Sequence, residues 1–413
     1  MEGISFYYVS LLIHNLSLIP VVFLSFIFYF LCIYAITFQN DVRKRNVIKE
    51  YPFVSIHIPV YNDIIVGRCI QKCLELDYPK DKYEIIVIDD STDEKVKKVV
   101  DSFKGKIKIL RRENREGFKP GALNYALKKS KGDIIVIFDS DEIPPRNFLK
   151  EVVKHFNDEK IAMVQTKLKI YNSNKTIVSK FASLVLYVYY DIFLPAFFKN
   201  RILHCAGSSV AIRKDVLLKL GGWNQSSVTE DTDFSIKLLL NGYKAVYLKN
   251  LQTKAEAPVD LKSFIRQQAR WTFGIVRGFV ENWKDIITAN TLNFTQKFLI
   301  TFQLFLGYFL GIFIIIFTFS GLFVFIFGEP REPTLMDLFK TVGIFFMTSG
   351  FLANLFFVSF KEKIKIKFEL IFVLLTLGFL LLVTNTIYFF RAFFTNKFYW
   401  HVTPKYSNRF IKS

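Results

Sequence analysis

Two pairs of aspartates follow short apolar segments, where their carboxylates suit chemistry on a nucleotide. Asp89 and Asp90 end the segment YEIIVIDD, and Asp139 and Asp141 end DIIVIFDSD. Carboxylates at i and i+2 beyond a buried strand place oxygen ligands around one point, which suits Mg²⁺ or Mn²⁺ shared with a diphosphate. A strand-end carboxylate can also accept hydrogen bonds from a ribose hydroxyl or a base N–H. The alternatives are an Asx turn that begins a helix and a solvated acidic turn.

A third acidic segment, VTEDTDF at residues 228–234, offers a candidate general base. In a dry site that raises its pKa toward the working pH, Asp231 can deprotonate an attacking hydroxyl. The alternative is helix capping, because Thr229 is a suitable N-cap and acidic residues suit the first turn of a helix. The segment alone does not decide between the two.

The segment FIRQQARWTFG places three binding side chains on one helical face. Gln267, Arg270 and Trp271 stand at i, i+3 and i+4. Arginine can clamp a diphosphate, tryptophan can stack on a sugar ring, and glutamine can bond hydroxyls. The alternative is a helix at the membrane interface, which tryptophan and arginine both favour. Upstream, Lys119 in GFKPGAL lies at the predicted start of a helix, where it can help to bind an anion.

The elements that must position these residues alternate between strand and helix. Apolar, β-branched runs at Phe53–Pro59, Tyr83–Asp89, Lys106–Arg111 and Asp133–Asp139 predict buried strands, and the stretches between them have helical period and length. This alternation predicts an α/β domain with a largely parallel sheet. Ligands bind at the carboxyl ends of such strands, which is where the two aspartate pairs stand.

Apolar runs long enough to span a bilayer flank this domain. Two basic segments predict the cytosolic side: DVRKRNVIK follows the first run, and KEKIKIK precedes the last. The segment GEPREP predicts the outer side. One span before the domain and three after it would put the basic C-terminal tail outside, so one C-terminal segment is expected to lie in the interface or to re-enter. The predicted runs are Leu16–Phe38, Phe298–Phe327, Leu338–Phe360 and Phe368–Phe390.

Composition supports a membrane protein that handles phosphates. Hydrophobic residues make up 51% of the 413 residues, with 47 Phe, and the formal net charge is +19. The basic excess suits anionic lipid or phosphate-bearing substrates, and the chain carries no recognisable nucleic-acid-binding motif. Cys69 and Cys73 stand one helical turn apart, but no second Cys or His pair completes a zinc site. Reduced thiols in a cytosolic domain are therefore expected for all four cysteines.

Taken in order, the polar segments resemble the motifs of the family 2 inverting glycosyltransferases. These segments are IPVYND, IDDSTD, GFKPGAL, FDSD, GGW, VTED and QQARW. The resemblance is strongest to the membrane-embedded, often processive branch, which contains cellulose synthase-like, β-mannan synthase-like, chitin and hyaluronan synthases. It covers about Phe53–Trp271 and implies a GT-A fold. Asp63 stands where the family usually carries Glu.

The resemblance implies a role for each matching residue. Asp139 and Asp141 would bind the divalent metal, Mg²⁺ or Mn²⁺, and the diphosphate, and Asp231 would be the catalytic base. The tail segment YWHVTPK, with Val402, Thr403 and Lys405, resembles the family's gating loop. The nucleotide site would comprise Tyr61, Asp63, Asp89, Asp90, Lys119 and Asp139, and the acceptor and diphosphate site would comprise Glu230, Gln267, Arg270 and Trp271.

The expected protein is a multi-pass cell-membrane glycosyltransferase with a cytosolic catalytic domain. It would move a hexose from a UDP- or GDP-sugar donor to a glycan hydroxyl, with processive β-glycan synthesis and translocation as an extension. The rivals are a polyprenyl-phosphate or lipid glycosyltransferase and a non-catalytic membrane scaffold or transporter. The predicted parts are a transmembrane helix with its basic flank at 1–46, the GT-A domain at 47–292, transmembrane helices at 293–392 and a basic tail at 393–413.

Overall fold

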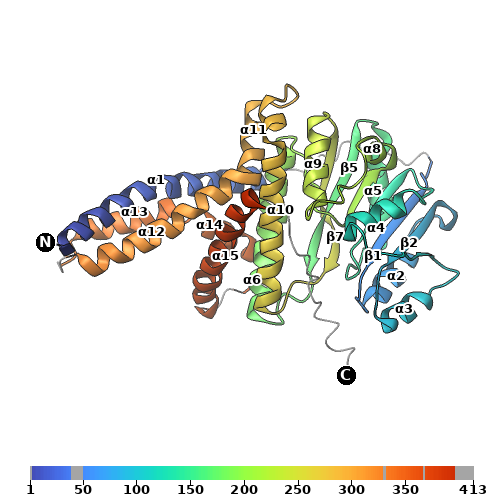
Figure 1. The fold of residues 1–413 in the computed structure, drawn as a ribbon, viewed down its shortest axis with the longest axis horizontal. Coiled ribbons are helices and arrows are strands. Elements are labelled where there is room, and N and C mark those ends of the chain that lie inside the picture. The colour runs from blue at the N-terminus through green and yellow to red at the C-terminus, as the bar shows by residue number, and fades with distance from the viewer. Residues whose placement is uncertain (1, 39–49, 329–331, 366–367, 396–413) are drawn as a thin grey trace.

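The computed structural model describes residues 2–38, 50–328, 332–365 and 368–395, and it joins an α/β domain to a bundle of long apolar helices (Figure 1). The domain is built on a seven-stranded sheet. Helix α1 (Glu2–Ile36), in blue, and helix α12 (Gly307–Phe327), in orange, lie side by side and extend away from the domain. The predicted combination of an α/β domain with apolar helices is therefore confirmed.

The four strands that the sequence predicts form the parallel half of the sheet. Strand β1 (Val54–Val60) lies between β2 (Tyr83–Asp89) and β4 (Ile134–Ile137), and β3 (Lys108–Leu110) pairs with the other side of β2. Because all three pairs are parallel, the carboxyl ends of these strands meet at one edge of the sheet. Nearly every residue of β1 and β4 is buried, which is typical of parallel strands that are covered on both faces.

Three further strands were not predicted. They are β5 (Ile161–Ile170), β6 (Val210–Arg213) and β7 (Lys244–Ala255), and the full order is β3-β2-β1-β4-β6-β5-β7. Strand β6 is antiparallel to both of its neighbours, while β5 and β7 are parallel, so the sheet is mostly parallel, as expected. Strand β5 buries Gln165, Thr166 and Lys167, and these polar residues hide its strand pattern in the sequence.

Helices cover both faces of the sheet because neighbouring strand residues point to opposite sides. Val136 packs in the core beneath α2 (Val66–Leu74), while the adjacent Ile135 packs in the core beneath α6 (Ile177–Val188). The domain's other helical elements in the described chain are 3₁₀ turns at Lys80–Lys82 and Lys154–Asn157, a π-helical turn at Tyr189–Phe193, α3 (Glu94–Asp101), α4 (Phe118–Leu127), α5 (Phe148–Val153), α7 (Leu194–Lys199), α8 (Lys214–Lys219), α9 (Glu230–Leu240) and α10 (Leu261–Thr288).

The apolar C-terminal region differs from the prediction in one span. The run predicted as Leu338–Phe360 forms two helices, α13 (Leu335–Thr348) and α14 (Gly350–Lys361), bent by 65°. The bend falls at a Ser-Gly pair, which commonly kinks a helix. The other described helices here are α11 (Phe294–Thr301), a π-helical turn at Phe302–Leu306 that continues into α12, and α15 (Phe368–Phe394).

By length and composition, four helical stretches of the described residues could cross a membrane, and the bent α13–α14 pair is a fifth candidate. One of the four, Ile177–Lys199, is mostly buried within the protein. Phe181, Leu184 and Phe197 of this stretch belong to the domain core. Its apolar character is therefore explained by packing beneath the sheet.

Candidate active site

The first aspartate pair lies at the carboxyl end of β2, and two arginines hold it. Arg112 Nε donates to Asp90 Oδ1 at 2.9 Å and its Nη2 donates to Asp90 Oδ2 at 2.5 Å, with both side chains nearly buried. Arg111 Nε donates to Asp89 Oδ2 at 3.0 Å. Such bidentate pairing fixes the orientation of the Asp90 carboxylate. Sequence reasoning missed both arginines, which follow their aspartates by 22 residues.

Tyr61 and Asp63 come from the loop after β1, beside this pair. The backbone N–H of Asp90 donates to the Val60 carbonyl at 3.1 Å, which holds the two strand ends together. The guanidinium of Arg115 lies 3.4 Å from the centroid of the Tyr61 ring, in cation–π contact. The structure therefore brings the predicted nucleotide-binding residues of β1 and β2 to one edge and adds basic side chains to them.

The second aspartate pair lies at the end of β4 and is tied into the fold. Ser140 Oγ donates to Asp63 Oδ2 at 2.5 Å, so this acidic turn contacts the loop after β1. Asp141 is buried, and its Oδ2 accepts from the backbone N–H of Glu256 at 3.0 Å. The Asp139 side chain is 40% exposed and accepts from Lys119 Nζ at 2.7 Å. Asp139 thus faces outward while Asp141 is anchored.

Lys119 connects the second aspartate pair to the TED segment, residues 229–231. Its ammonium lies 4.0 Å from Glu230 Oε1 and donates to the Gly207 carbonyl at 3.1 Å. The charges of Asp139, Glu230 and Asp231 raise the pKa of Lys119 against the opposing effect of its burial. Lys119 is therefore a fixed positive charge among three carboxylates, Asp139 beyond β4 and Glu230 and Asp231 at the start of α9.

The TED carboxylates have raised pKa values. Burial raises the pKa of Glu230 to about 7 against the attraction of Lys119, and it also raises the pKa of Asp231. Lys119, the N–H of Thr232 and Arg270 favour the ionised form of Asp231. Thr229 is the N-cap residue of α9, as predicted, but its side chain makes no capping hydrogen bond. The capping explanation for this segment is therefore incomplete.

The Gly207–Ser209 turn closes the site behind Asp231. Gly207 has a φ of +77°, and a Cβ at this position would lie 2.6 Å from Asp231 Oδ2. Glu142, which sequence reasoning missed, accepts from Ser208 Oγ at 2.6 Å and from Ser209 Oγ at 3.0 Å. Burial and the charges of Asp139 and Asp141 raise the pKa of Glu142 to about 8. The FDSDE segment contained this residue, but nothing in the sequence linked it to the two serines.

Helix α10 brings the QQARW residues to the TED segment. Arg270 Nη1 donates to the Val228 carbonyl at 3.3 Å. One turn later, a Cβ on Gly274 would lie 2.4 Å from Thr229 Cγ2, so the helix touches the segment closely. Gln267 and Trp271 are half-buried on the same helix. On the opposite side of α10, Thr272 and Val276 are buried because α15 packs against this side.

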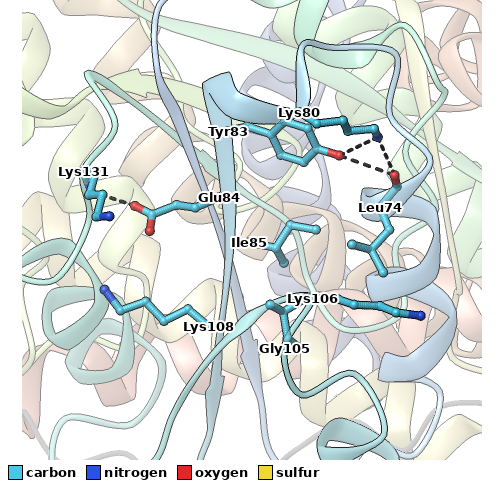
Figure 2. A pocket seen from close by; sticks show the side chains of 10 residues that line it. Leu74, Lys80, Tyr83, Glu84, Ile85, Gly105, Lys106, Lys108 and Lys131 are labelled. Atoms are coloured by element: carbon cyan, nitrogen blue, oxygen red, sulfur yellow. Dashed lines mark hydrogen bonds between the residues drawn. The ribbon is translucent and has the colours of Figure 1, made fainter.

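A separate groove lies at the other end of the sheet (Figure 2). The groove lies near the start of β2. There Lys80 Nζ donates to the Tyr83 hydroxyl at 2.8 Å, and Glu84 Oε1 accepts from the backbone N–H of Lys131 at 2.7 Å. Its ten lining residues include none of the predicted site residues. The groove is therefore distinct from the cluster of acidic residues around Lys119.

Comparison with known proteins decides the family. A family model described as "Glycosyltransferase like family 2" matches residues 52–274, which contain all the aspartates described above and the QQARW segment. The chain belongs to glycosyltransferase family 2. The family that the motifs resemble is therefore confirmed.

Curated relatives of this family 2 chain include mannosyltransferases. It is 29% identical over 270 residues to a probable glucomannan 4-beta-mannosyltransferase 7 of Oryza sativa, covering 62% of this chain and 46% of the relative. It is 30% identical over 280 residues to glucomannan 4-beta-mannosyltransferase 9 of Arabidopsis thaliana, covering 65% and 52%. A probable glycosyltransferase YdaM of Bacillus subtilis is 30% identical over 247 residues, covering 58% and 59%. The chain spans about half the length of these relatives.

A solved structure shares the fold of the family 2 chain. Mannosyltransferase PcManGT from Pyrobaculum calidifontis, in complex with GDP-Man and Mn²⁺, has a TM-score of 0.63 and 20% sequence identity. The likeness covers 85% of this chain and 99% of that one. It confirms the GT-A fold.

The donor set at the end of β4 fits a divalent cation shared with a ligand. In the described residues no group of three or more His, Cys, Asp or Glu side chains could hold a metal ion by itself. Asp139 and Asp141 offer hard oxygen ligands, as Mg²⁺ and Mn²⁺ require, and such ions commonly take further oxygens from phosphate. The predicted gating-loop residues Val402, Thr403 and Lys405 lie outside the described residues.

Proposed function

We propose that this chain is a membrane-bound inverting glycosyltransferase that moves a hexose from a nucleoside diphosphate sugar to a glycan hydroxyl. The observation that carries the proposal is the position of Lys119, 2.7 Å from Asp139 and 4.0 Å from Glu230. The ammonium group of Lys119 thus links Asp139, one of the aspartates suited to the diphosphate, with the TED segment that holds the candidate base. This proximity supports donor and acceptor chemistry at one place.

In this proposal Asp231 is the general base. It takes the proton of the acceptor hydroxyl, whose oxygen forms a bond to the anomeric carbon on the face opposite the diphosphate. The bond from that carbon to the diphosphate oxygen breaks, and its electron pair leaves with the nucleotide. Lys119 and Arg270 offset the negative charge that develops on the diphosphate. One displacement of this kind inverts the anomeric configuration.

Asp139 and Asp141 would hold Mg²⁺ or Mn²⁺ together with oxygens of the diphosphate. When bound, the cation supplies further charge stabilisation to the leaving diphosphate. Tyr61, Asp63, Asp89 and Asp90 would hold the nucleoside, with the two arginines keeping the last two carboxylates oriented. Glu230, Gln267 and Trp271 would contact the acceptor and the transferred sugar.

GDP-mannose is the donor that the relatives support best, with UDP-hexoses as the alternative. PcManGT binds GDP-Man, and two of the relatives described above are named as mannosyltransferases. The proposed location is the cell membrane, with several membrane-spanning helices and the catalytic domain in the cytosol. The basic segments DVRKRNVIK and KEKIKIK support this orientation.

The test is a donor panel with product analysis. The purified full chain is incubated with GDP- and UDP-sugars, Mn²⁺ or Mg²⁺, and a β-mannan oligosaccharide, and the products are analysed by mass spectrometry and NMR. The proposal predicts a β-linked oligosaccharide from GDP-mannose and a loss of transfer in excess EDTA. A lipid-extractable monosaccharide as the sole product, formed with co-purified lipid, would favour a lipid glycosyltransferase instead. Absence of any sugar-nucleotide turnover would contradict catalysis.

A further inference from the structure

Helix α15 has the length and composition of a membrane span, yet its contacts run along the domain. Thr272 Oγ1 on α10 donates to Asn385 Oδ1 at 2.8 Å, and Arg277 Nη1 donates to the Ala392 carbonyl at 3.3 Å. The partners are 113 and 115 residues apart, so α10 and α15 run parallel and nearly in register. Figure 1 shows the two helices side by side, at an angle to α1 and α12.

The start of α15 is held close to the domain by the segment before it. At the end of α14, Lys361 Nζ donates to Asp191 Oδ1 at 2.6 Å, and Glu362 accepts from Lys167 Nζ at 2.6 Å. Asp191 and Lys167 are buried in the catalytic domain. Phe368 follows Glu362 by six residues, an extended reach of about 20 Å at most. A crossing helix would carry one end about 30 Å away, through the hydrocarbon core.

The end of α15 also lies at the domain side. Besides the bond between Arg277 and Ala392, the ring of Phe389 packs 5.2 Å from Phe305, in the π-helical turn before α12. That turn is anchored to the domain, because Gln303 Nε2 lies 2.7 Å from His204 Nδ1. Both ends of the 27-residue helix are therefore on the same side.

The other apolar segments behave differently, because each has one end at the domain and one end far from it. Lys199 Nζ donates to Thr37 Oγ1 beyond the C-terminal end of α1, while Phe6 near its start stacks 6.1 Å from Phe327 at the far end of α12. The chain returns from that far end through α13 and α14, and Gly350 N donates to Ser25 Oγ of α1 at 2.7 Å on the way. These segments supply three crossings.

The charges that flank α15 agree with this arrangement. Lys361, Lys363 and Lys365 precede the helix, and Arg391 lies in its last turn, followed in sequence by further basic residues. The positive-inside rule places both flanks on the cytosolic side, which a crossing helix could not satisfy.

We infer that α15 lies along the bilayer surface beside α10, so the chain crosses the membrane three times and residue 395 is on the side of the catalytic domain. The inference rests on the proposed membrane attachment. The partner of α15 is the apolar boundary of the leaflet that faces the domain, which Phe372, Leu375, Ile387 and Phe390 contact through their exposed side chains.

Site-directed cysteine labelling in cells and in inside-out vesicles tests this topology. Single cysteines are introduced as Lys365→Cys before α15 and as Arg391→Cys and Thr395→Cys at its end, in a chain with Cys32→Ala. A membrane-impermeant maleimide is the probe. Lys98→Cys on α3 reports the side of the catalytic domain, and Glu332→Cys before α13 reports the opposite side. Cys69, Cys73 and Cys205 are buried, and the parent chain serves as the blank.

The expected result is that Lys365→Cys and at least one of Arg391→Cys and Thr395→Cys are labelled only in inside-out vesicles, together with Lys98→Cys. Glu332→Cys should be labelled only in intact cells. Labelling of the two ends of α15 from opposite sides would overturn the inference, as would failure of both C-terminal positions to react from the domain side. Carbonate extraction distinguishes these failures from failure of the membrane proposal, because a chain that is not embedded would be released.

Discussion

At the residue scale, Lys119 is the side chain that joins the parts of the site. Lys119→Met removes its charge, and we expect the kcat/KM of transfer to fall about 10²- to 10³-fold, the range for losing one pre-organised charge-stabilising group. Lys119→Arg should recover part of the loss because it keeps the charge. Steady-state kinetics and the Kd for the nucleotide measure both effects. Activity of Lys119→Met within a factor of about 3 of wild type would contradict the role.

The raised pKa values of the TED carboxylates predict an acid limb in the pH profile. Burial raises the pKa of Asp231 and takes that of Glu230 to about 7, so the ionised form of Asp231 is lost on acidification at a higher pH than for an exposed aspartate. The kcat/KM of transfer should therefore fall on acidification at a higher pH than an exposed aspartate would give. Glu230→Gln removes a neighbouring negative charge, lowers the pKa of Asp231 and should move this limb to lower pH. An unmoved limb would show that the two carboxylates do not interact.

At the element scale, the close packing of α10 against the TED segment depends on Gly274. In Gly274→Ala the new Cβ would lie 2.4 Å from Thr229 Cγ2, so α10 or the segment must shift. We expect a loss of activity of at least about tenfold, with about 1–3 kcal/mol of stability lost to overpacking. Gly278→Ala on the same helix is the matched control, because its Cβ would make ordinary contacts of 3.5 Å. Adding Thr229→Ala to Gly274→Ala should restore activity, and no rescue would contradict this packing.

The elements also show what the sequence could and could not predict. Strands β1, β2 and β4 were predicted because their apolar residues are continuous, whereas β5 was missed because its buried Gln165, Thr166 and Lys167 look polar. Their partners, such as the Ser209 carbonyl for Thr166 Oγ1 at 2.8 Å, exist only in the folded chain. The aspartate positions were predicted from strand ends, but Arg111, Arg112 and Glu142 were not, because contacts distant in sequence define their roles.

At the scale of the whole molecule, a buried ion network joins the catalytic domain to the end of α14. Lys167 contacts both Asp191 and Glu362, and Lys361 is a second lysine that contacts Asp191. Asp191→Asn should lower stability by about 3–5 kcal/mol because it leaves Glu362 as the one carboxylate of this network for the lysines around it, Lys167 among them buried. Thermal unfolding in detergent measures the change, and Glu94→Gln, which breaks the exposed pair with Lys97, is the control expected to cost at most about 1 kcal/mol. Equal effects would show that the network does not join the two parts.

The central claim is that the acidic start of α9 performs the chemistry of a nucleotide-sugar transferase. Asp231→Asn in the full chain tests it most directly, with transfer from the active donor and nucleotide binding measured on the same preparation. The account predicts that nucleotide binding and thermal stability are kept while transfer falls by at least about 10³-fold, as expected when a general base is lost. Transfer by Asp231→Asn at the wild-type rate would contradict it.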